Sequence, residues 1–330
     1  MSTDSPASPH QPLGVAGGLF VLLLALLWAG TSVTAREAVD TVTPLAVGGV
    51  RFGLAAVFML GWCRWEGVSV GLRRNQRWPA IIMGVLLFLQ IATFNWGVAW
   101  SNASHATLLV NTYIFWVAAF EHFVARTARL GAQQALGLIV AAIGAGVLFI
   151  EAPQQVQHHT VATGVSQGDI NHSALPRDEA TLSGDLMLCL SAALLAVKVL
   201  YTKHAVRLVP SGTLILWHDV FGTVIFIVTS AAFESWPAAP WTTPVVTSLL
   251  YAGLVVSGFC FAGHAWMLRR HSASSISIFS FATPVFGVFL AVLLRGDRLS
   301  TWLILSGVLV AAGILMMNLP GRRNAAVDIE

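Results

Sequence analysis

Charged side chains are scarce in this sequence. Only 10% of its 330 residues are Asp, Glu, Lys or Arg, whereas 56% are hydrophobic and the mean hydropathy is +0.75. Soluble domains carry about 25% charged residues, because their surfaces face water. The composition therefore excludes a soluble domain and predicts an integral membrane protein. The net charge of +3 resides in short basic loops and no nucleic-acid motif is present, so we expect a lipid-bilayer environment and no nucleic-acid partner.

Cysteine is also rare, and the motifs of several enzyme classes are missing. Cys63, Cys189 and Cys260 lie far apart in or beside apolar segments, which excludes a disulfide framework and a metal-ligand spacing. The sequence has no G-x-x-x-x-G-K-[ST] motif, so ATP is not expected to drive the protein directly. Ser257-Gly258 lacks the G-x-S-G context of an intramembrane serine protease. We expect no catalytic residue, no cofactor and no metal; an intramembrane enzyme acting on a lipid or peptide is the alternative hypothesis.

Long apolar runs, in contrast, are abundant. A helix that spans a bilayer needs about 20 mostly apolar residues. Ten segments meet this condition, at residues 13–34, 44–63, 79–100, 103–123, 131–150, 183–203, 212–231, 243–267, 273–293 and 300–319. The polar residues before the first segment lack a basic n-region and a cleavage site, so we expect that segment to be a retained helix. The predicted fold class is an all-α integral membrane protein with ten transmembrane helices.

An internal repeat divides these helices into two sets of five. RTARLGAQQALG starts at Arg126 and the related RGDRLSTWLILSG starts at Arg295, which is 169 positions later. Three further pairs follow the same order at offsets of 167 to 170: WAGTSVTAR with LAVKVLYTK, VRFGLAAVF with DVFGTVIFI, and ASHATLL with ASSISIF. Because five is odd, the second copy must be inverted. Inverted five-helix repeats are typical of secondary transporters, whose substrate site lies near the midplane between the halves.

The basic residues predict an orientation. With the N-terminus inside, the inner loops and tail hold twelve lysines and arginines and the outer loops hold four, which predicts that both termini are cytoplasmic. Residues 151–182 are polar, free of aromatic residues and without helical periodicity. The expected organisation is a cytoplasmic tail, a first repeat, a polar extracytoplasmic linker, a second repeat and a second cytoplasmic tail, at residues 1–12, 13–150, 151–182, 183–320 and 321–330.

Three segments resemble the EamA-repeat family of the drug/metabolite transporter superfamily. WAGTSVTAREAV resembles that family's W-G-S-N-F-type opening, VRFGLAAVFML resembles its R-F motif, and FATPVFGVFLAVLLRGDRLSTWLILSGVLVAAGIL resembles its end-of-repeat signature. The resemblance covers residues 13–320 and implies ten helices, an inverted two-fold axis and a central cavity. The sequence departs from the family pattern at Tyr113-Ile114-Phe115-Trp116, where a proline is common, and at Lys198, where an uncharged residue is usual.

The resemblance implies a permease of the aromatic amino-acid and metabolite exporter type. We expect it to move a small-molecule substrate, such as an amino acid or a related amphipathic compound, by alternating access in the direction of export or exchange. The expected location is the cell membrane, which is the inner membrane if the source is bacterial. The expected assembly is a monomer or a homodimer.

Lys198 is the most unusual residue inside a predicted span, because a buried charge costs about 3 kcal/mol at a helix centre. It lies five residues from Lys203 at the inner end, so about 7–8 Å from the inner face. Two interpretations remain: its side chain snorkels to water, or it lines the cavity and meets an anionic group on the substrate. Its repeat equivalent is Thr31, which favours the cavity, and Asp219 is the natural partner.

Three further span residues are candidates for function. Arg51 is expected to pair with Glu37 or Asp40, or to snorkel outward. Asp219 is a candidate for proton coupling or for an ion pair. Pro284 is expected to kink the ninth span, and the freed carbonyls are tolerated only against protein or a water-filled cavity.

Aromatic and amide side chains away from the span ends complete the expected cavity, because aromatic walls with a few polar groups suit a small amphipathic solute. Packing between helices is the alternative for each tryptophan. The expected cavity residues are Trp28, Thr31, Asn95, Asn111, Trp116, Lys198 and Pro284. The expected residues for coupling or ion pairing are Asp219, Lys198 and Arg51.

Overall fold

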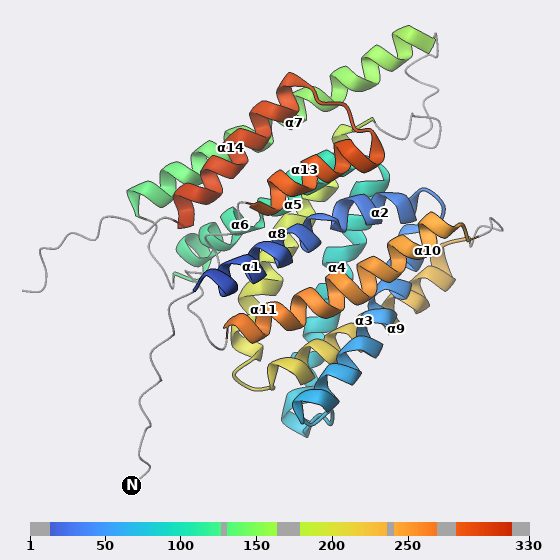
Figure 1. Cartoon of the computed structure of the whole chain (residues 1–330), viewed down its shortest axis with the longest axis vertical. Coiled ribbons are helices and arrows are strands. Elements are labelled where there is room, and N and C mark those ends of the chain that lie inside the picture. The colour runs from blue at the N-terminus through green and yellow to red at the C-terminus, as the bar shows by residue number, and fades with distance from the viewer. Residues whose placement is uncertain (1–13, 127–130, 164–178, 236–240, 269–281, 319–330) are drawn as a thin grey trace, which may run out of the picture.

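The computed structural model describes residues 14–126, 131–163, 179–235, 241–268 and 282–318, and every regular element in these ranges is helical (Figure 1). Eight helical segments are long and apolar enough to cross a membrane. Two shorter apolar helices, Ala282–Arg295 and Thr301–Met317, complete the ten expected spans. The sequence prediction of an all-α, ten-helix membrane protein is therefore confirmed. Residues 273–281 of the expected ninth span lie outside the described residues.

The elements follow the order of the two repeats. The first repeat contains α1 (Val15–Ala29), α2 (Thr31–Val39), α3 (Pro44–Glu66), η1 (Arg74–Gln76), α4 (Arg77–Ala99), α5 (Ala103–Asn111), α6 (Tyr113–Ala119), η2 (Phe120–Val124) and α7 (Ala132–Thr163). The second contains α8 (Leu182–Ala205), α9 (Ser211–Phe233), α10 (Thr243–Leu250), η3 (Tyr251–Cys260), α11 (Phe261–Leu268), α13 (Ala282–Arg295) and α14 (Thr301–Asn318). The elements η2 and η3 are π-helical stretches within longer spans.

Local sequence signals explain several of the helix boundaries. The Asn102 side chain accepts a hydrogen bond from the His105 backbone N–H at the start of α5, and Thr181 caps α8 in the same way. Pro44 occupies the first turn of α3, where its missing N–H has no intrahelical partner. Gly67 ends α3 with a φ of 68°, a left-handed conformation that favours glycine.

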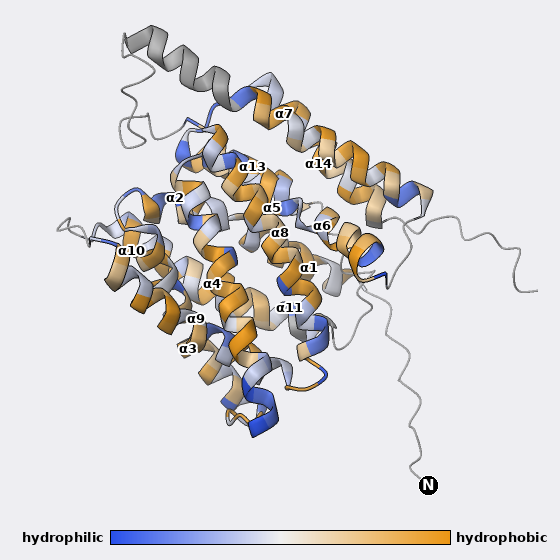
Figure 2. Cartoon of the chain, turned by 180° about the vertical axis from the view of Figure 1, so that it is seen from behind, coloured by the Kyte–Doolittle hydropathy of each residue, from blue (hydrophilic) through white to orange (hydrophobic). Residues whose placement is uncertain are grey.

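The helix surfaces suit a lipid environment. Apolar residues cover most of the length of the helices, whereas hydrophilic residues gather toward helix ends and loops (Figure 2). Large apolar side chains that face outward include Val57, Val228 and Val308, with exposed fractions of 69%, 62% and 61%. Exposure on this scale would be unfavourable in water and is favourable in hydrocarbon.

The two repeats pack with two-fold-related contacts. The helices α7 and α14 lie side by side at one edge of the molecule, and α3 packs along α9 (Figure 1). A Cβ added to Gly144 of α7 would lie 2.9 Å from Leu309 Cβ, and one added to Gly313 of α14 would lie 2.8 Å from Ala141 Cβ. Gly144 and Gly313 are 169 positions apart, which is the repeat offset. The duplicated small residues therefore permit the same close helix approach twice.

A second pair of glycines repeats this relation nearer the centre of the molecule. Gly84 of α4 packs against Phe221 of α9, where an added Cβ would lie 2.5 Å from the Phe221 Cβ. Gly253 of η3, again 169 positions later, packs against Leu54 of α3, where the corresponding distance is 2.6 Å. The repeat is therefore present in the packing as well as in the sequence.

The first span is broken at Gly30, between α1 and α2. The Tyr251 hydroxyl donates a hydrogen bond of 2.8 Å to the Leu27 carbonyl beside this break. A Cβ on Gly30 would lie 2.9 Å from the Tyr251 hydroxyl oxygen, so a larger residue there would displace the Tyr251 ring. The break and the π-helical η3 that begins at Tyr251 thus lie together, at an interface between the repeats. Both features are irregularities that often occur at functional sites.

Helix α7 differs from the expectation for residues 151–182. It continues to Thr163, so the residues from 152 to 163 are helical and not an irregular linker. Their polar composition concealed this, because an apolar stripe is the usual sign of a helix. Residues 164–178 of the same segment lie outside the described residues.

Candidate functional site

Four ionisable side chains are buried between the repeats, and we call them the central cluster: Arg51 of α3, Lys198 of α8, and His218 and Asp219 of α9. Their exposed fractions are 4%, 6%, 5% and 1%. Burial of charge in a span is expensive and marks a substrate or ion pathway by default. Because the cluster combines one residue of the first repeat with three of the second, any relative motion of the repeats changes its surroundings.

The two cations of the central cluster are held by neutral polar groups. Arg51 Nε donates a hydrogen bond of 2.9 Å to Ser257 Oγ of η3. Lys198 Nζ donates one of 3.0 Å to Gln90 Oε1 of α4, and Gln90 Nε2 in turn donates to Ser191 Oγ at 3.1 Å. The tip of Lys198 is thus turned toward α4 inside the protein, which is the opposite of what snorkelling requires.

The anion of the central cluster has a histidine as its direct partner. His218 Nδ1 lies 2.8 Å from Asp219 Oδ1, whereas the buried Asp219 Oδ2 has no hydrogen-bond partner. Lys198 and Arg51 both interact with Asp219 through space, but neither forms an ion pair with it within 4.0 Å. The structure therefore brings the three expected charges into one region without the direct Lys198–Asp219 contact that the sequence predicted.

The predicted partners of Arg51 are wrong. Glu37 and Asp40 of the first repeat both bind Arg295 of the second, with Arg295 Nη2 at 2.5 Å from Asp40 Oδ2. Arg36 also approaches Asp40, at 3.5 Å. The carboxylates near the start of α3 are therefore occupied by arginines at the same end of the bundle, and Arg51 turns inward to Ser257.

The expected polar cavity residues are bonded mainly to backbone. Asn95 is fully buried. Its Nδ2 donates a hydrogen bond of 2.8 Å to the Pro44 carbonyl, and its Oδ1 has no hydrogen-bond partner. Asn111 Nδ2 donates a hydrogen bond of 2.7 Å to the Thr107 carbonyl, one turn earlier in the same helix. Thr31 Oγ1 donates to the Trp28 carbonyl at 2.5 Å, across the break between α1 and α2. None of these side chains hydrogen-bonds to the central cluster.

The remaining cavity candidates lie apart from one another. Trp28 stacks edge-on against Phe261 and His264 at ring distances of 5.2 and 5.5 Å, so it packs at the contact of the first and eighth spans. Trp116 is 38% exposed and is not enclosed by helices. Pro284 is buried in α13, and the residues that precede Ala282, which a kink at Pro284 would involve, lie outside the described residues.

A second buried polar group was missed by sequence reasoning. His105 of α5 lies between Asp185 of α8 and Glu151 of α7, and Ser101 Oγ donates 2.7 Å to the second oxygen of Asp185. All three ionisable side chains are at most 4% exposed. They were overlooked because each lies close to a predicted span end, where polar residues are ordinary. The sequence did contain one indication of this site. All three residues lie near the ends of expected spans, and the inverted topology places these ends on the same side of the membrane.

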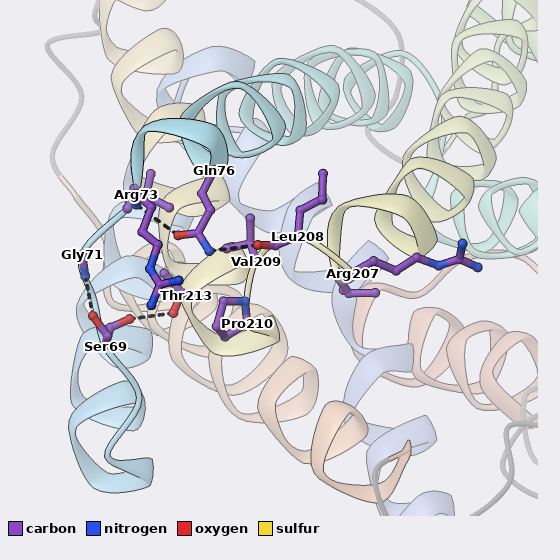
Figure 3. Close-up of a pocket in the computed structure, with 11 residues that line it drawn as sticks. Ser69, Gly71, Arg73, Gln76, Arg207, Leu208, Val209, Pro210 and Thr213 are labelled. Atoms are coloured by element: carbon purple, nitrogen blue, oxygen red, sulfur yellow. Dashed lines mark hydrogen bonds between the residues drawn. The ribbon is translucent and has the colours of Figure 1, made fainter. Parts of the chain in front are cut away.

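A pocket of about 690 Å³ lies at the opposite end of the bundle from His105, Asp185 and Glu151. It is lined by residues at the adjoining ends of α3, α4, α8 and α9 (Figure 3). Thr213 Oγ1 donates a hydrogen bond of 2.7 Å to the Ser69 carbonyl across the pocket, and Gln76 Nε2 donates one of 2.8 Å to the Leu208 carbonyl. The side chain of Arg207 points away from it (Figure 3). The residues that line this pocket include none of the central cluster, so it is a separate opening at the helix ends.

Comparison with known proteins agrees with this architecture. The model of the EamA-like transporter family matches residues 15–150 and 182–319, which are the two repeats. An uncharacterized transporter, YoaV of Bacillus subtilis (strain 168), is 25% identical over 90% of this chain and 95% of its own. A probable amino-acid metabolite efflux pump of Salmonella typhimurium (strain LT2) is also 25% identical, over 94% of this chain and 98% of its own.

The fold has also been observed experimentally. A protein of known crystal structure aligns with a TM-score of 0.62 at 17% identity and covers 90% of this chain and 94% of its own. At this identity the likeness concerns the fold alone.

Proposed function

Because this chain belongs to the EamA-like transporter family and is a membrane permease for small metabolites, we propose that it exports or exchanges small carboxylate-bearing compounds, such as amino acids. The relatives named above are transporters, which supports a role without catalysis. The efflux relative supports export of amino-acid metabolites in particular. The twelve-to-four bias of basic residues supports an orientation with both termini in the cytoplasm.

The observation that carries this proposal is the unfilled hydrogen-bonding capacity of the central cluster. Lys198 donates to Gln90 alone among the described residues, although an ammonium group has three N–H donors. Asp219 Oδ2 is buried with no hydrogen-bond partner. A substrate carboxylate would meet Lys198 and a substrate amino group would meet Asp219. A zwitterion thus satisfies both ends of a site that the protein leaves incomplete.

The burial of the central cluster supports alternating access. With exposed fractions of 6% or less, its side chains cannot be reached from either side in this conformation. Contacts between the repeats hold the bundle at both ends. The Glu234 carboxylate accepts from the Leu45 and Ala46 backbone N–H groups at one end, and Thr213 donates to Ser69 at the other. Rocking of one repeat against the other would break one set at a time and open the site to each side in turn.

The proposal is tested by counterflow in proteoliposomes. Vesicles are loaded with an unlabelled amino acid and the uptake of its radiolabelled form is followed. The compound is chosen by a growth screen that compares amino acids and toxic analogues in cells with and without the protein. We expect uptake by the wild type and a loss of at least about tenfold in Lys198→Ala, because one charge-assisted contact is worth about 1.5–3 kcal/mol.

Lys203→Ala is the matched control. Lys203 lies on the same helix, is 59% exposed and pairs with Glu121 at the surface, so its removal should leave counterflow unchanged. If the folded protein moves none of the metabolites tested, the proposal that it transports such compounds is refuted. Equal flux in Lys198→Ala and the wild type would refute the role of the central cluster alone.

A further inference from the structure

The side chains around His105 are arranged so that one proton on the imidazole links two carboxylates. His105 Nδ1 lies 2.9 Å from Asp185 Oδ2, and His105 Nε2 lies 3.5 Å from Glu151 Oε2. Asp185 accepts a further hydrogen bond from Ser101 through its other oxygen. We call His105, Asp185 and Glu151 the histidine triad. Its imidazole is 1% exposed, so water does not screen these contacts.

The positions of the two carboxylates select the protonated form of the histidine. A neutral imidazole has one N–H donor and one lone pair, whereas an imidazolium has two donors. Both ring nitrogens face a carboxylate oxygen here. In the neutral form one nitrogen lone pair would therefore face a buried negative charge, which is repulsive. The imidazolium removes that repulsion and neutralises one of the two negative charges.

Within the part of the chain that the structure describes, the charged groups that act on the imidazole are Asp185 and Glu151. Asp185 and Cys189 are contributed by α8, and Glu151 by α7. Asp297, after α13, accepts from the neighbouring Ser104 backbone N–H at 2.8 Å. Arg36 of α2 is directed to the carbonyls of residues 98 and 99 at the end of α4. The field at the imidazole is therefore dominated by carboxylates, which favours the bound proton.

The histidine triad also joins the two halves of the protein. His105 belongs to the first repeat and Asp185 to the second, and Glu151 directly follows the first repeat within α7. His105 lies in the first turn of α5 and Asp185 in the first turn of α8, whereas Glu151 lies in the second half of α7. We propose that the histidine triad is a proton-binding site that locks the repeats together at this end of the bundle, so that opening there requires release of the proton to the adjoining solution. Its consequence for transport rests on the proposed function, whereas proton binding and locking do not.

The lock is tested first without any transport. The melting temperature of the full-length protein in detergent is measured between about pH 5 and about pH 10, a range that spans histidine titration. Proton binding stabilises the folded state, so stability is present at low pH and is lost as pH rises through the titration. We expect the wild-type melting temperature to fall by about 3 °C or more, and His105→Gln to lack this fall because it binds no proton. His204→Gln, which alters an exposed histidine, should keep the wild-type profile.

Glu151→Gln provides a second variant that keeps the histidine. It leaves the imidazolium with one carboxylate in place of two, so the fall in melting temperature should move to lower pH. If His105→Gln does not fold, this shift alone decides the question. Identical profiles for the wild type, His105→Gln and Glu151→Gln would overturn the proton site.

Counterflow at varied pH on the triad side of the vesicle then tests the consequence for transport. The wild-type rate should change with that pH, and the rate of His105→Gln should not. A pH-dependent melting profile with pH-independent transport would overturn the lock but keep the proton site. Absence of flux in all proteins refutes the proposed function and leaves the melting result valid.

Discussion

Replacing Asp219 with asparagine should destabilise the protein and abolish transport together. Asp219 supplies the negative charge that interacts with Lys198 and Arg51 inside the bundle. Neither cation lies within 4.0 Å of it, so each interaction is bounded by the energy at that distance, which is about 4 kcal/mol at an effective dielectric constant of 20. Since all three side chains are at most 6% exposed, solvent does not reduce this bound appreciably. The expected loss for Asp219→Asn is about 3–5 kcal/mol, as for other buried charges that lose a partner.

A double-mutant cycle separates charge balance from substrate binding. Lys198→Met removes one of the two unbalanced cations, so the double variant with Asp219→Asn should recover about half of the lost stability. Its counterflow should remain absent, because both groups that are proposed to bind the substrate are gone. The assays are thermal unfolding in detergent, at about 2–4 °C per kcal/mol, and counterflow in proteoliposomes. Additive losses in the double variant, or an unaltered melting temperature in Asp219→Asn, would refute the electrostatic reasoning.

Three further predictions concern contacts between the repeats. Gly144→Ala should lower the melting temperature because its Cβ would lie 2.9 Å from a neighbouring side chain of α14, whereas Gly146→Ala on the same helix meets nothing within 4 Å and should be neutral or slightly stabilising. Tyr251→Phe keeps the ring but leaves the carbonyl of residue 27 without its donor, so it should cost about 1 kcal/mol in denaturant unfolding; no change would mean that another group satisfies the carbonyl. Arg295→Gln removes the ion pairs to Glu37 of α2 and to Asp40 at its C-terminal cap, so it should increase hydrogen exchange in α2 but not in α9. An equal increase in both helices would show that these ion pairs do not act locally.

Several features of the fold were predictable because their causes are local in the sequence. The length of each apolar run is set by the thickness of the bilayer, so ten spans can be counted without a structure. The repeat was visible because four segments of the first half recur in the same order in the second, at offsets of 167 to 170. The structure adds the matching close approaches at Gly144 and Gly313. The extension of α7 to Thr163 was missed for the converse reason, since a polar helix carries no apolar stripe.

The candidate site was predictable in its residues and much less in their contacts. Arg51, Lys198 and Asp219 were recognisable because a charge in a span is rare. Their partners were not, because a hydrogen bond depends on the rotation and depth of two helices that are distant in sequence. Lys198 reaches Gln90 at a separation of 108 residues, and Arg51 reaches Ser257 at a separation of 206.

The sequence by itself determined that this protein is a ten-helix membrane protein of two inverted repeats, since hydrophobic length, basic loops and duplication are properties of the linear chain. Only the tertiary structure decided which charges share an environment. It gathered His105, Asp185 and Glu151 from three helices into one triad, and it assigned Glu37 and Asp40 to Arg295 in place of Arg51. The physical reason is that electrostatic energy depends on distance and burial, and both are established only when the helices have packed.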